Sequence, residues 1–301
     1  MRRRATLAGT LAALALLAPL GAGTARAQGL LDKSSGPVAI DADEGIEWRR
    51  DEKVYIATGN AKAVRGDVTV TAHRLLAYYR ERAPAPGATK TTDKDADSGM
   101  SNTDIYRLVA EKDVTIATPT QIARGDHAVY DVDRSVLVLT GRKLSLDTSL
   151  DHITARDSLE YWDARKVAVA RGDGVMVRAD RRVQGDVLTA HIAEDKKTNT
   201  SKVNEVDAFG NVRISTATQI AQGGKGVYNM VTNVAYLVDN VRVTQGRNQL
   251  DGDYGEVNLN TNVSRMLSGP SAGRPGQRVR SLLSPSQGEP PGPAAAPRKG
   301  S

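Results

Sequence analysis

Apolar and polar residues alternate in short runs along most of this chain. In each run two apolar residues stand two positions apart, which places both side chains on one face of an extended strand. The runs recur from about Pro37 to Leu267, and no convincing amphipathic helix interrupts them. We therefore predict that this stretch is β throughout. The clearest pairs are Val68/Val70, Val114/Ile116, Leu144/Leu146, Val175/Val177, Val212/Ile214 and Val241/Val243.

A short phrase with glycine or asparagine precedes these pairs, and a tyrosine or histidine follows them. It is clearest in Gly59-Asn60, which leads to Tyr78-Tyr79, and in Gly210-Asn211, which leads to Tyr228. Glycine, asparagine and aspartate take positive φ at little cost, so we expect these phrases to form turns at the joins between strands. A repeat of roughly 30 to 40 residues indicates stacked supersecondary units. Weaker copies begin at Lys112, Gly141, Gly172 (which leads to His191) and Asp239.

Three segments do not share the alternation. Residues 1–27 combine a basic start, an apolar run too short to span a bilayer (~20 residues) and a small-residue cleavage site, so they predict a cleaved signal peptide and an exported protein. Residues 82–103 are polar and rich in proline and glycine, and predict a flexible insertion. Residues 268–301 predict a disordered tail. The folded domain is then expected over 37–267.

Composition and charge exclude several functions. The chain has no cysteine, so disulfides, thiol catalysis and cysteine metal sites are excluded. The formal charge is +6; the predicted signal peptide carries +4 of it and the tail another +4, which leaves about −2 on the domain. A nucleic-acid surface needs clustered cations on the folded face, and none is visible. Aromatic residues are scarce, which suits a narrow open trough and equally a slender solenoid core.

The first copy resembles the signature of the OstA-like (LptA-like) family. The matching residues are Thr58-Gly59-Asn60-Ala61-Lys62-Ala63, Gly66-Asp67-Val68-Thr69-Val70, and the entry strand from Pro37 to Asp43. The resemblance implies an elongated open β-jellyroll, a V-shaped antiparallel trough. It also implies a periplasmic lipopolysaccharide transport protein that shields acyl chains in the trough on the way from the inner to the outer membrane.

The same resemblance assigns roles to residues. It implies that the lipid-binding trough is lined by Val68, Val70, Val114, Ile116, Leu144, Leu146, Val175, Val177, Val212, Ile214, Val241 and Val243. Terminal strand edges are expected to dock inner-membrane and outer-membrane transport components, with head-to-tail self-association as a further option; the strands chosen contain Val38, Ile40, Val241, Val243, Val257 and Leu259. No cofactor is expected, and we predict that the protein is not an enzyme.

Two other classes stay open. A β-solenoid enzyme acting on polysaccharide would need paired carboxylates roughly 5–10 Å apart, and Asp67, Asp126, Asp157, Asp186 and Asp253 recur before the aromatic positions. A structural scaffold that binds only proteins would need a filled interior. The four histidines (His73, His127, His152 and His191) lack zinc-site spacing, so no metal site is predicted. Lys62, Arg178, Arg213 and Arg242 are expected on the outside or the rim, where they could meet lipid phosphates.

Overall fold

The computed structural model describes residues 38–81, 103–195, 200–267 and 279–283. The predicted signal peptide, nearly all of the predicted insertion and most of the predicted tail lie outside the described residues. Within the described residues, no helix combines the length and apolar character needed to cross a membrane.

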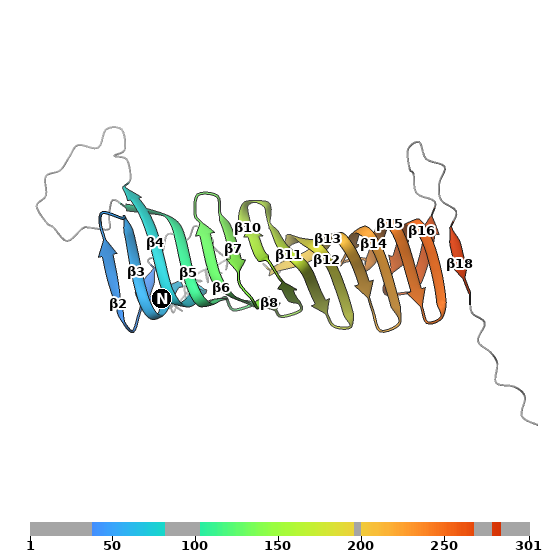
Figure 1. The fold of residues 1–301 in the computed structure, drawn as a ribbon, viewed down its shortest axis with the longest axis horizontal. Helices are drawn as coiled ribbons and strands as arrows, with labels where there is room; N and C mark the ends of the chain where they lie inside the picture. The colour runs from blue at the N-terminus through green and yellow to red at the C-terminus, as the bar shows by residue number, and fades with distance from the viewer. Residues whose placement is uncertain (1–37, 82–102, 196–199, 268–278, 284–301) are drawn as a thin grey trace, which may run out of the picture.

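The described residues form 18 strands of one sheet, with only a short 3-10 turn at Asp163–Arg165. Every pairing is antiparallel, and the strands follow one another along the long axis of the molecule (Figure 1). This confirms the predicted all-β architecture. The strands are β1 (Ala39–Asp41), β2 (Gly45–Arg49), β3 (Val54–Arg65), β4 (Val68–Glu81), β5 (Thr103–Ala117), β6 (Gln121–Asp131), β7 (Val136–Thr140), β8 (Leu144–Thr148), β9 (His152–Ala155), β10 (Ser158–Trp162), β11 (Val167–Arg178), β12 (Arg181–Asp195), β13 (Thr200–Ser215), β14 (Gln219–Asn229), β15 (Val234–Gln245), β16 (Asn248–Asn258), β17 (Val263–Leu267) and β18 (Arg280–Leu282).

The long strands bend at a corner, and the Gly-Asn phrases lie there. On β3 the pairing with β4 shifts register between Thr58 and Ala61, where Gly59 has φ 84° and Asn60 has φ 41°. The expectation that these phrases join one strand to the next is wrong. Two residues with positive φ inside a strand form a bulge that bends it without ending it. The reversals lie elsewhere, for example at Gly66-Asp67 between β3 and β4.

The corners divide the sheet into two walls. Wall A contains β2, β7, β10 and β17, wall B contains β1, β8, β9 and β18, and the other strands pass through both. The walls meet along the corners. At the opposite side the hairpin turns of wall A face those of wall B, and we call this the open side.

The six sequence copies correspond to six pairs of bent strands. Each copy starts at the corner of one strand, continues to the end of that strand, and then includes the following strand, which returns in the opposite direction. In the third pair the corners are wide enough to break each strand in two, which gives β7 with β8 and β9 with β10. The stacked-repeat prediction thus describes the architecture.

Carboxylates from one strand support the corner of the next. Asp126 accepts a hydrogen bond from the backbone N–H of Arg142 at 2.9 Å, and Asp186 accepts from the side-chain amide of Asn211 at 3.1 Å. A Cβ on Gly141 would lie 2.9 Å from the Asp126 carboxylate carbon. Glycine therefore recurs at these corners because the neighbouring carboxylate occupies the space of a side chain.

One part of the predicted disordered tail is ordered. Residues Arg280–Leu282 form β18, which pairs with Gln249–Asp251 of β16. The prediction of disorder is wrong for these residues, because their backbone pairs with β16 and completes the wall B edge of the sheet. Figure 1 shows β18 beside β16 at the C-terminal end of the molecule.

Candidate functional site

The inner face of wall B carries one unbroken row of side chains from the first strand to the last. Each member stands directly opposite the next across the sheet, and every member except the final serine is apolar. At ~4.8 Å between strands, the thirteen steps from end to end span about 60 Å. We call this set the apolar row: Ile40, Ala63, Val70, Ile116, Ala123, Leu146, Ile153, Met176, Val183, Ile214, Ala221, Val243, Leu250 and Ser281.

Wall A carries two rows that run the same way. The row nearer the corner is apolar throughout and mixes leucine with alanine and glycine: Ile46, Ala57, Leu75, Ala110, Ala128, Leu139, Leu159, Ala170, Leu188, Ala208, Gly226, Leu237, Gly255 and Met266. The row nearer the open side includes Tyr130, Tyr161 and Tyr228, which are three of the predicted aromatic positions.

Ten of the twelve predicted lining residues share the inner face of wall B. Val70, Ile116, Leu146, Ile214 and Val243 belong to the apolar row itself. Val114, Leu144, Val212 and Val241 lie two residues closer to the corner, each with no more than 2% of its surface exposed, and Val68 lies two residues toward the open side. The sequence reasoning missed wall A, although the alternation of Leu137 with Leu139 is a signal of the same kind.

Val175 and Val177 do not face the interior, and the prediction for these two residues is wrong. Val175 stands opposite Gln184, which in turn stands opposite Arg213, so Val175 belongs to a row of polar residues on the outer face. The apolar row instead takes Met176, which is 3% exposed. Here three apolar residues stand in succession, so alternation alone could not tell which face was inside. The longer methionine fills the interior, and the two valines lie among polar residues outside.

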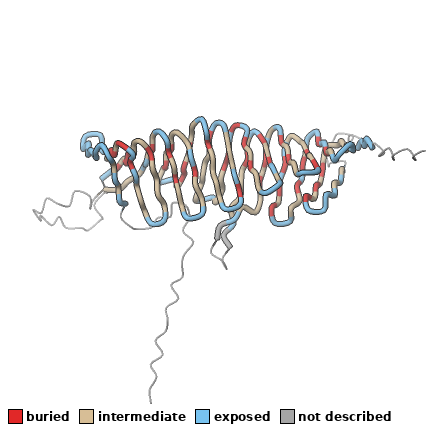
Figure 2. Tube along the Cα trace, turned by 90° about the horizontal axis from the view of Figure 1, so that it is seen from below, coloured by how far each residue is buried: buried red, intermediate tan, exposed pale blue. Residues whose placement is uncertain are grey.

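The two walls pack directly against each other in the C-terminal half. Val206 and Leu237 of wall A belong to the same buried cluster as Ile214 and Val243 of wall B. A Cβ on Gly255 of wall A would lie 2.8 Å from Val241 of wall B. Glycines in the wall A row therefore let the walls approach. In Figure 2 buried stretches of the chain recur on successive strands along the length of the molecule.

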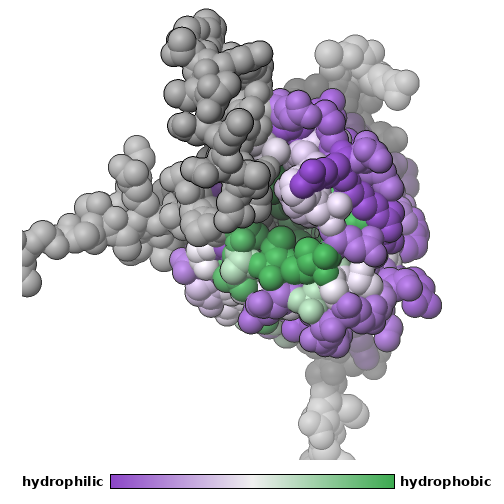
Figure 3. Space-filling model, turned by 90° about the vertical axis from the view of Figure 1, so that its left-hand side faces the viewer, coloured by the Kyte–Doolittle hydropathy of each residue, from purple (hydrophilic) through white to green (hydrophobic). Residues whose placement is uncertain are grey.

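The N-terminal end presents apolar surface. Ile46 on β2 is 55% exposed, and the end view shows apolar side chains gathered at the mouth between polar rims (Figure 3). Beside it Trp48 stacks on Tyr55 at 5.5 Å between ring centroids, and its indole N–H donates to the hydroxyl of Tyr79 at 2.8 Å. This aromatic group lies at the open-side margin of wall A and links β2, β3 and β4.

The free edges of the sheet are not where the sequence placed all of them. Val241 and Val243 lie on β15, which is paired on both sides, and Val257 lies on β16, which pairs with β15 and β17. Leu259 follows β16 and is buried. The docking prediction for these four residues is wrong, because the chain adds β17 and β18 beyond them. Ile40 on β1 and the adjacent Val38 do lie at the N-terminal edge.

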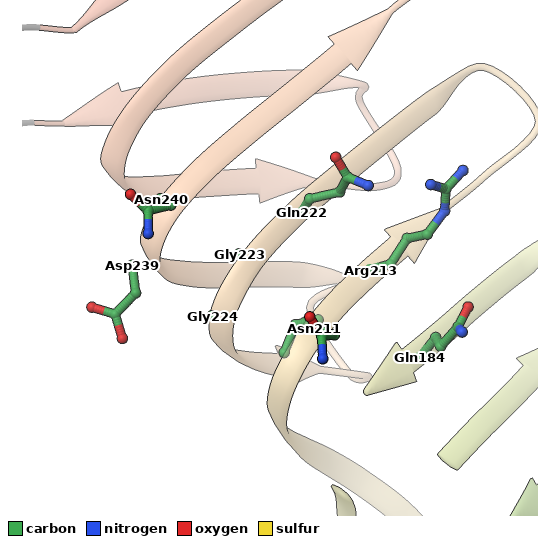
Figure 4. Close-up of a pocket in the computed structure, with 9 residues that line it drawn as sticks. Gln184, Asn211, Arg213, Gln222, Gly223, Gly224, Asp239 and Asn240 are labelled. Atoms are coloured by element: carbon green, nitrogen blue, oxygen red, sulfur yellow. The ribbon is translucent and has the colours of Figure 1, made fainter. Parts of the chain in front are cut away.

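The predicted cations take different positions. Lys62 and Arg242 are exposed on the outer face of wall B, where Arg242 donates to Asp251 at 2.7 Å. Arg178 lies two residues after Met176 and therefore on the same, inner face of β11. Its guanidinium donates from Nε at 2.6 Å and from Nη2 at 2.5 Å to the two carboxylate oxygens of the buried Asp151. Arg213 lines a polar surface pocket of about 400 Å³ with Gln184 and Gln222 (Figure 4). This pocket lies on the outer face.

Three side chains of the types that bind metal ions lie together on the outer face of wall A. Among the described residues, only His191, Glu205 and Asp207 bring such atoms within 4.8 Å of one another. The Nε2 of His191 lies 2.8 Å from a carboxylate oxygen of Asp207. His191 stands where other copies of the repeat carry a tyrosine, but its side chain is not part of the aromatic row. It faces outward because Ala190 takes the inner position opposite Val206.

The family model for the LptA/(LptD N-terminal domain) LPS transport protein matches this chain twice, over residues 39–156 and 152–263. The chain belongs to this family. Its two matches meet at β9, so one chain holds two tandem copies of the LptA-type domain in one sheet. β9 pairs with β8 of the first match and β11 of the second, which makes the sheet continuous through the junction.

Two further similarities were found. An uncharacterized protein of Rhizobium meliloti (strain 1021) is 30% identical over 142 residues, which cover 47% of this chain and 68% of that protein. A solved structure of LptH, described as the LptA homologous periplasmic component of the lipopolysaccharide transport device from Pseudomonas aeruginosa, is 22% identical. It aligns with 45% of this chain and 95% of LptH at a TM-score of 0.39.

Proposed function

We propose that this protein carries lipopolysaccharide across the periplasm, with the acyl chains held between the two walls and the sugars outside. The observation that carries the proposal is the apolar row, which runs without a polar break until Ser281 at the last strand. An amphiphile can move along such a row without exposing its methylenes to water. Each methylene shielded contributes roughly 0.8 kcal/mol.

The walls must part for acyl chains to enter. In the described structure they touch, and a chain inserted between them would exchange wall–wall contacts for wall–lipid contacts. The apolar surface of the walls is buried both before and after the lipid enters. The free energy needed to part the walls around an acyl chain is therefore small relative to that of exposing either wall to water. The corner is continuous backbone, whereas the open side is bridged by side chains, and we infer that the walls separate there.

The terminal edges supply the docking surfaces. Within the described residues β1 and β2 pair only with β3, while β17 and β18 pair only with β16. Unpaired strand edges accept a further strand. Exposed apolar side chains accompany both ends, with Ile46 at one and Leu282 at the other. We infer that the partners are inner-membrane and outer-membrane transport components, or a second copy of this chain.

The corner carboxylates weaken the enzymatic alternative. Asp126 and Asp186 each hold the corner of a neighbouring strand, and Asp157 occupies the space beside Gly172 in the same way. Asp67 lies in an exposed hairpin turn. These roles are structural, and the family description names transport.

A photocrosslinker tests the interior. We would place it in the mature protein at Met176 or Ile214, and in matched variants at the outward neighbours Val175 and Arg213. Lipopolysaccharide adducts are expected at the two inner positions and not at the two outer ones. Equal labelling of inner and outer positions, or no adduct at any, would show that the interior does not carry the lipid.

A further inference from the structure

Arg181 bridges the open side of the C-terminal half. It starts β12 at the wall B margin, and its guanidinium reaches three residues of wall A. Nη1 donates to the hydroxyl of Tyr228 at 3.3 Å and to the side-chain oxygen of Asn233, and Nη2 donates to the side-chain oxygen of Asn260 at 2.7 Å. The Tyr228 hydroxyl in turn donates to Asn233 at 2.9 Å. One arginine thus ties β14 and two hairpin turns of wall A to wall B.

All three acceptors of Arg181 are neutral. Within the described residues no carboxylate lies at ion-pair distance from this guanidinium. Arg178, at the other end of the same hairpin, makes a two-bond ion pair with Asp151. Both arginines point to the same margin of the interior, but only Arg178 is neutralised. A half-buried guanidinium with neutral partners keeps its full charge available for an anion.

A second contact across the same margin leaves a polar atom unused. The side-chain amide of Gln219 on β14 donates to the hydroxyl of Ser264 on β17, and Thr218 donates to Asn262 at 3.5 Å. Gln219 is 3% exposed, and its carbonyl oxygen Oε1 is buried with no hydrogen-bond partner. A buried acceptor without a donor costs free energy. It offers a place for a hydroxyl or amide N–H of an incoming headgroup.

We propose that Arg181 is the binding subsite for a phosphate on the headgroup of the amphiphile, and that phosphate binding opens the open side. The inference rests on the proposed function. The acyl chains would lie between Tyr228 and the apolar row. The phosphate would then stand at the margin where Asn233 and Asn260 now accept from Arg181, and the Gln219 carbonyl would accept from the headgroup sugar.

The exchange has a clear direction. Phosphate oxygens accept two parallel bonds from a guanidinium, and the negative charge of the phosphate adds a Coulomb attraction that the neutral oxygens of Asn233 and Asn260 lack. Arg181 gives three of its five N–H donors to neutral acceptors, and a phosphate that accepts the Nη1 and Nη2 donors in their place releases Asn233 and Asn260. The walls then lose one of the polar bridges across the open side, where the lipid would enter.

A binding comparison tests the subsite. Diphosphoryl lipid A and the same lipid after enzymatic dephosphorylation would be bound to the mature full-length protein and to its R181Q and R181K variants. R242Q is the matched control, because Arg242 is ion-paired on the outer face. The wild type and R242Q are expected to prefer the phosphorylated lipid by about tenfold, a factor that equals about 1.4 kcal/mol. R181Q should lose this preference while it still binds the dephosphorylated lipid, and R181K should keep part of it.

The outcomes separate the two proposals. If R181Q keeps the wild-type preference, Arg181 is not the subsite, and the transport proposal is unaffected. If the wild type binds neither lipid, the transport proposal fails and the subsite with it. Inorganic phosphate is tested as a competitor. Competition at the same concentration as the lipid would mean a site for a free anion, which contradicts the headgroup assignment.

Discussion

The carboxylate of Asp186 on β12 occupies the space that a side chain on Gly210 of β13 would fill. Gly210 also has φ 70°, a conformation that costs other residues about 1 kcal/mol. The pair sits at the corner where the two walls meet. Both the backbone conformation and the neighbour therefore require glycine.

Replacing Gly210 with alanine should lower the free energy of unfolding by about 2–4 kcal/mol, the sum of conformational strain and the clash with Asp186. Urea unfolding followed by circular dichroism measures it. Gly246→Ala is the control, because Gly246 has φ 57° with open space around it, and it should cost about 1 kcal/mol. In the double variant Gly210→Ala/Asp186→Ala the clash is removed, so the cost of the alanine at position 210 should fall toward that of Gly246→Ala. An equal cost at Gly246 would contradict the packing argument.

Two neighbouring residues on β11 should lose very different amounts of stability on truncation. Met176→Ala removes a 3% exposed side chain from the packed interior and is expected to cost about 2–5 kcal/mol. Val175→Ala changes the polar outer face and should cost less than about 1 kcal/mol. Thermal unfolding of both variants decides the orientation of the strand. A larger loss for Val175→Ala would mean that β11 faces the other way.

The junction between the two family matches should be sensitive to acid. Burial raises the pKa of Glu160, but the guanidinium of Arg171, which donates at 2.7 Å, and the indole of Trp162 outweigh it and hold the pKa below its usual value. Glu160 therefore stabilises the fold fully above about pH 5, since the unfolded pKa is about 4.3. That contribution is lost as pH falls through the lower folded pKa.

The Arg171→Gln variant should remove most of this acid-side loss. Urea midpoints compared between about pH 3 and pH 6 measure it, because the folded pKa of Glu160 then moves back toward its unfolded value. Glu160→Gln serves as the control, since it removes the titrating group itself. An unchanged acid slope in both variants would show that other carboxylates control the transition.

Truncation after Leu267 should leave the fold intact and change its association. β18 is short and exposed, so its loss removes little burial. It does uncover the edge of β16 at Gln249–Asp251. We expect more head-to-tail assembly, because unpaired edges recruit strands. Sedimentation velocity at several concentrations measures it, and a purely monomeric truncated protein at all of them would contradict this role of β18.

The sequence predicted the strands and the repeat because period-two alternation depends only on local chemistry. It predicted the inner face at Val114, Val212 and Val241, where polar residues mark the outside. It failed at Val175-Met176-Val177, where no polar residue does so. The Gly-Asn phrases showed positive φ, but the same chemistry serves a reversal and a corner within a strand. Which edges stay free depends on Arg280–Leu282, whose pairing is formed across a long separation in sequence.

The Arg181 bridge was beyond sequence reasoning for a related reason. Its three acceptors lie roughly 50 to 80 positions away in the chain, and only the stagger between the walls brings them together. Arg178 and Arg181 look alike in sequence, and the buried Asp151 alone distinguishes them. The charge available at the margin is a property of the fold.

The continuous pairing of β9 with β8 and β11 affects how a relay could break. A bridge assembled from separate single-domain proteins has a joint at every domain boundary, and each joint opens at its own dissociation rate. Here the boundary between two domains is covalent and its strands are hydrogen-bonded on both sides, so opening it requires local unfolding. If the protein forms such a bridge, each copy of the chain therefore removes one joint that could separate, and dilution cannot dissociate the boundary inside it.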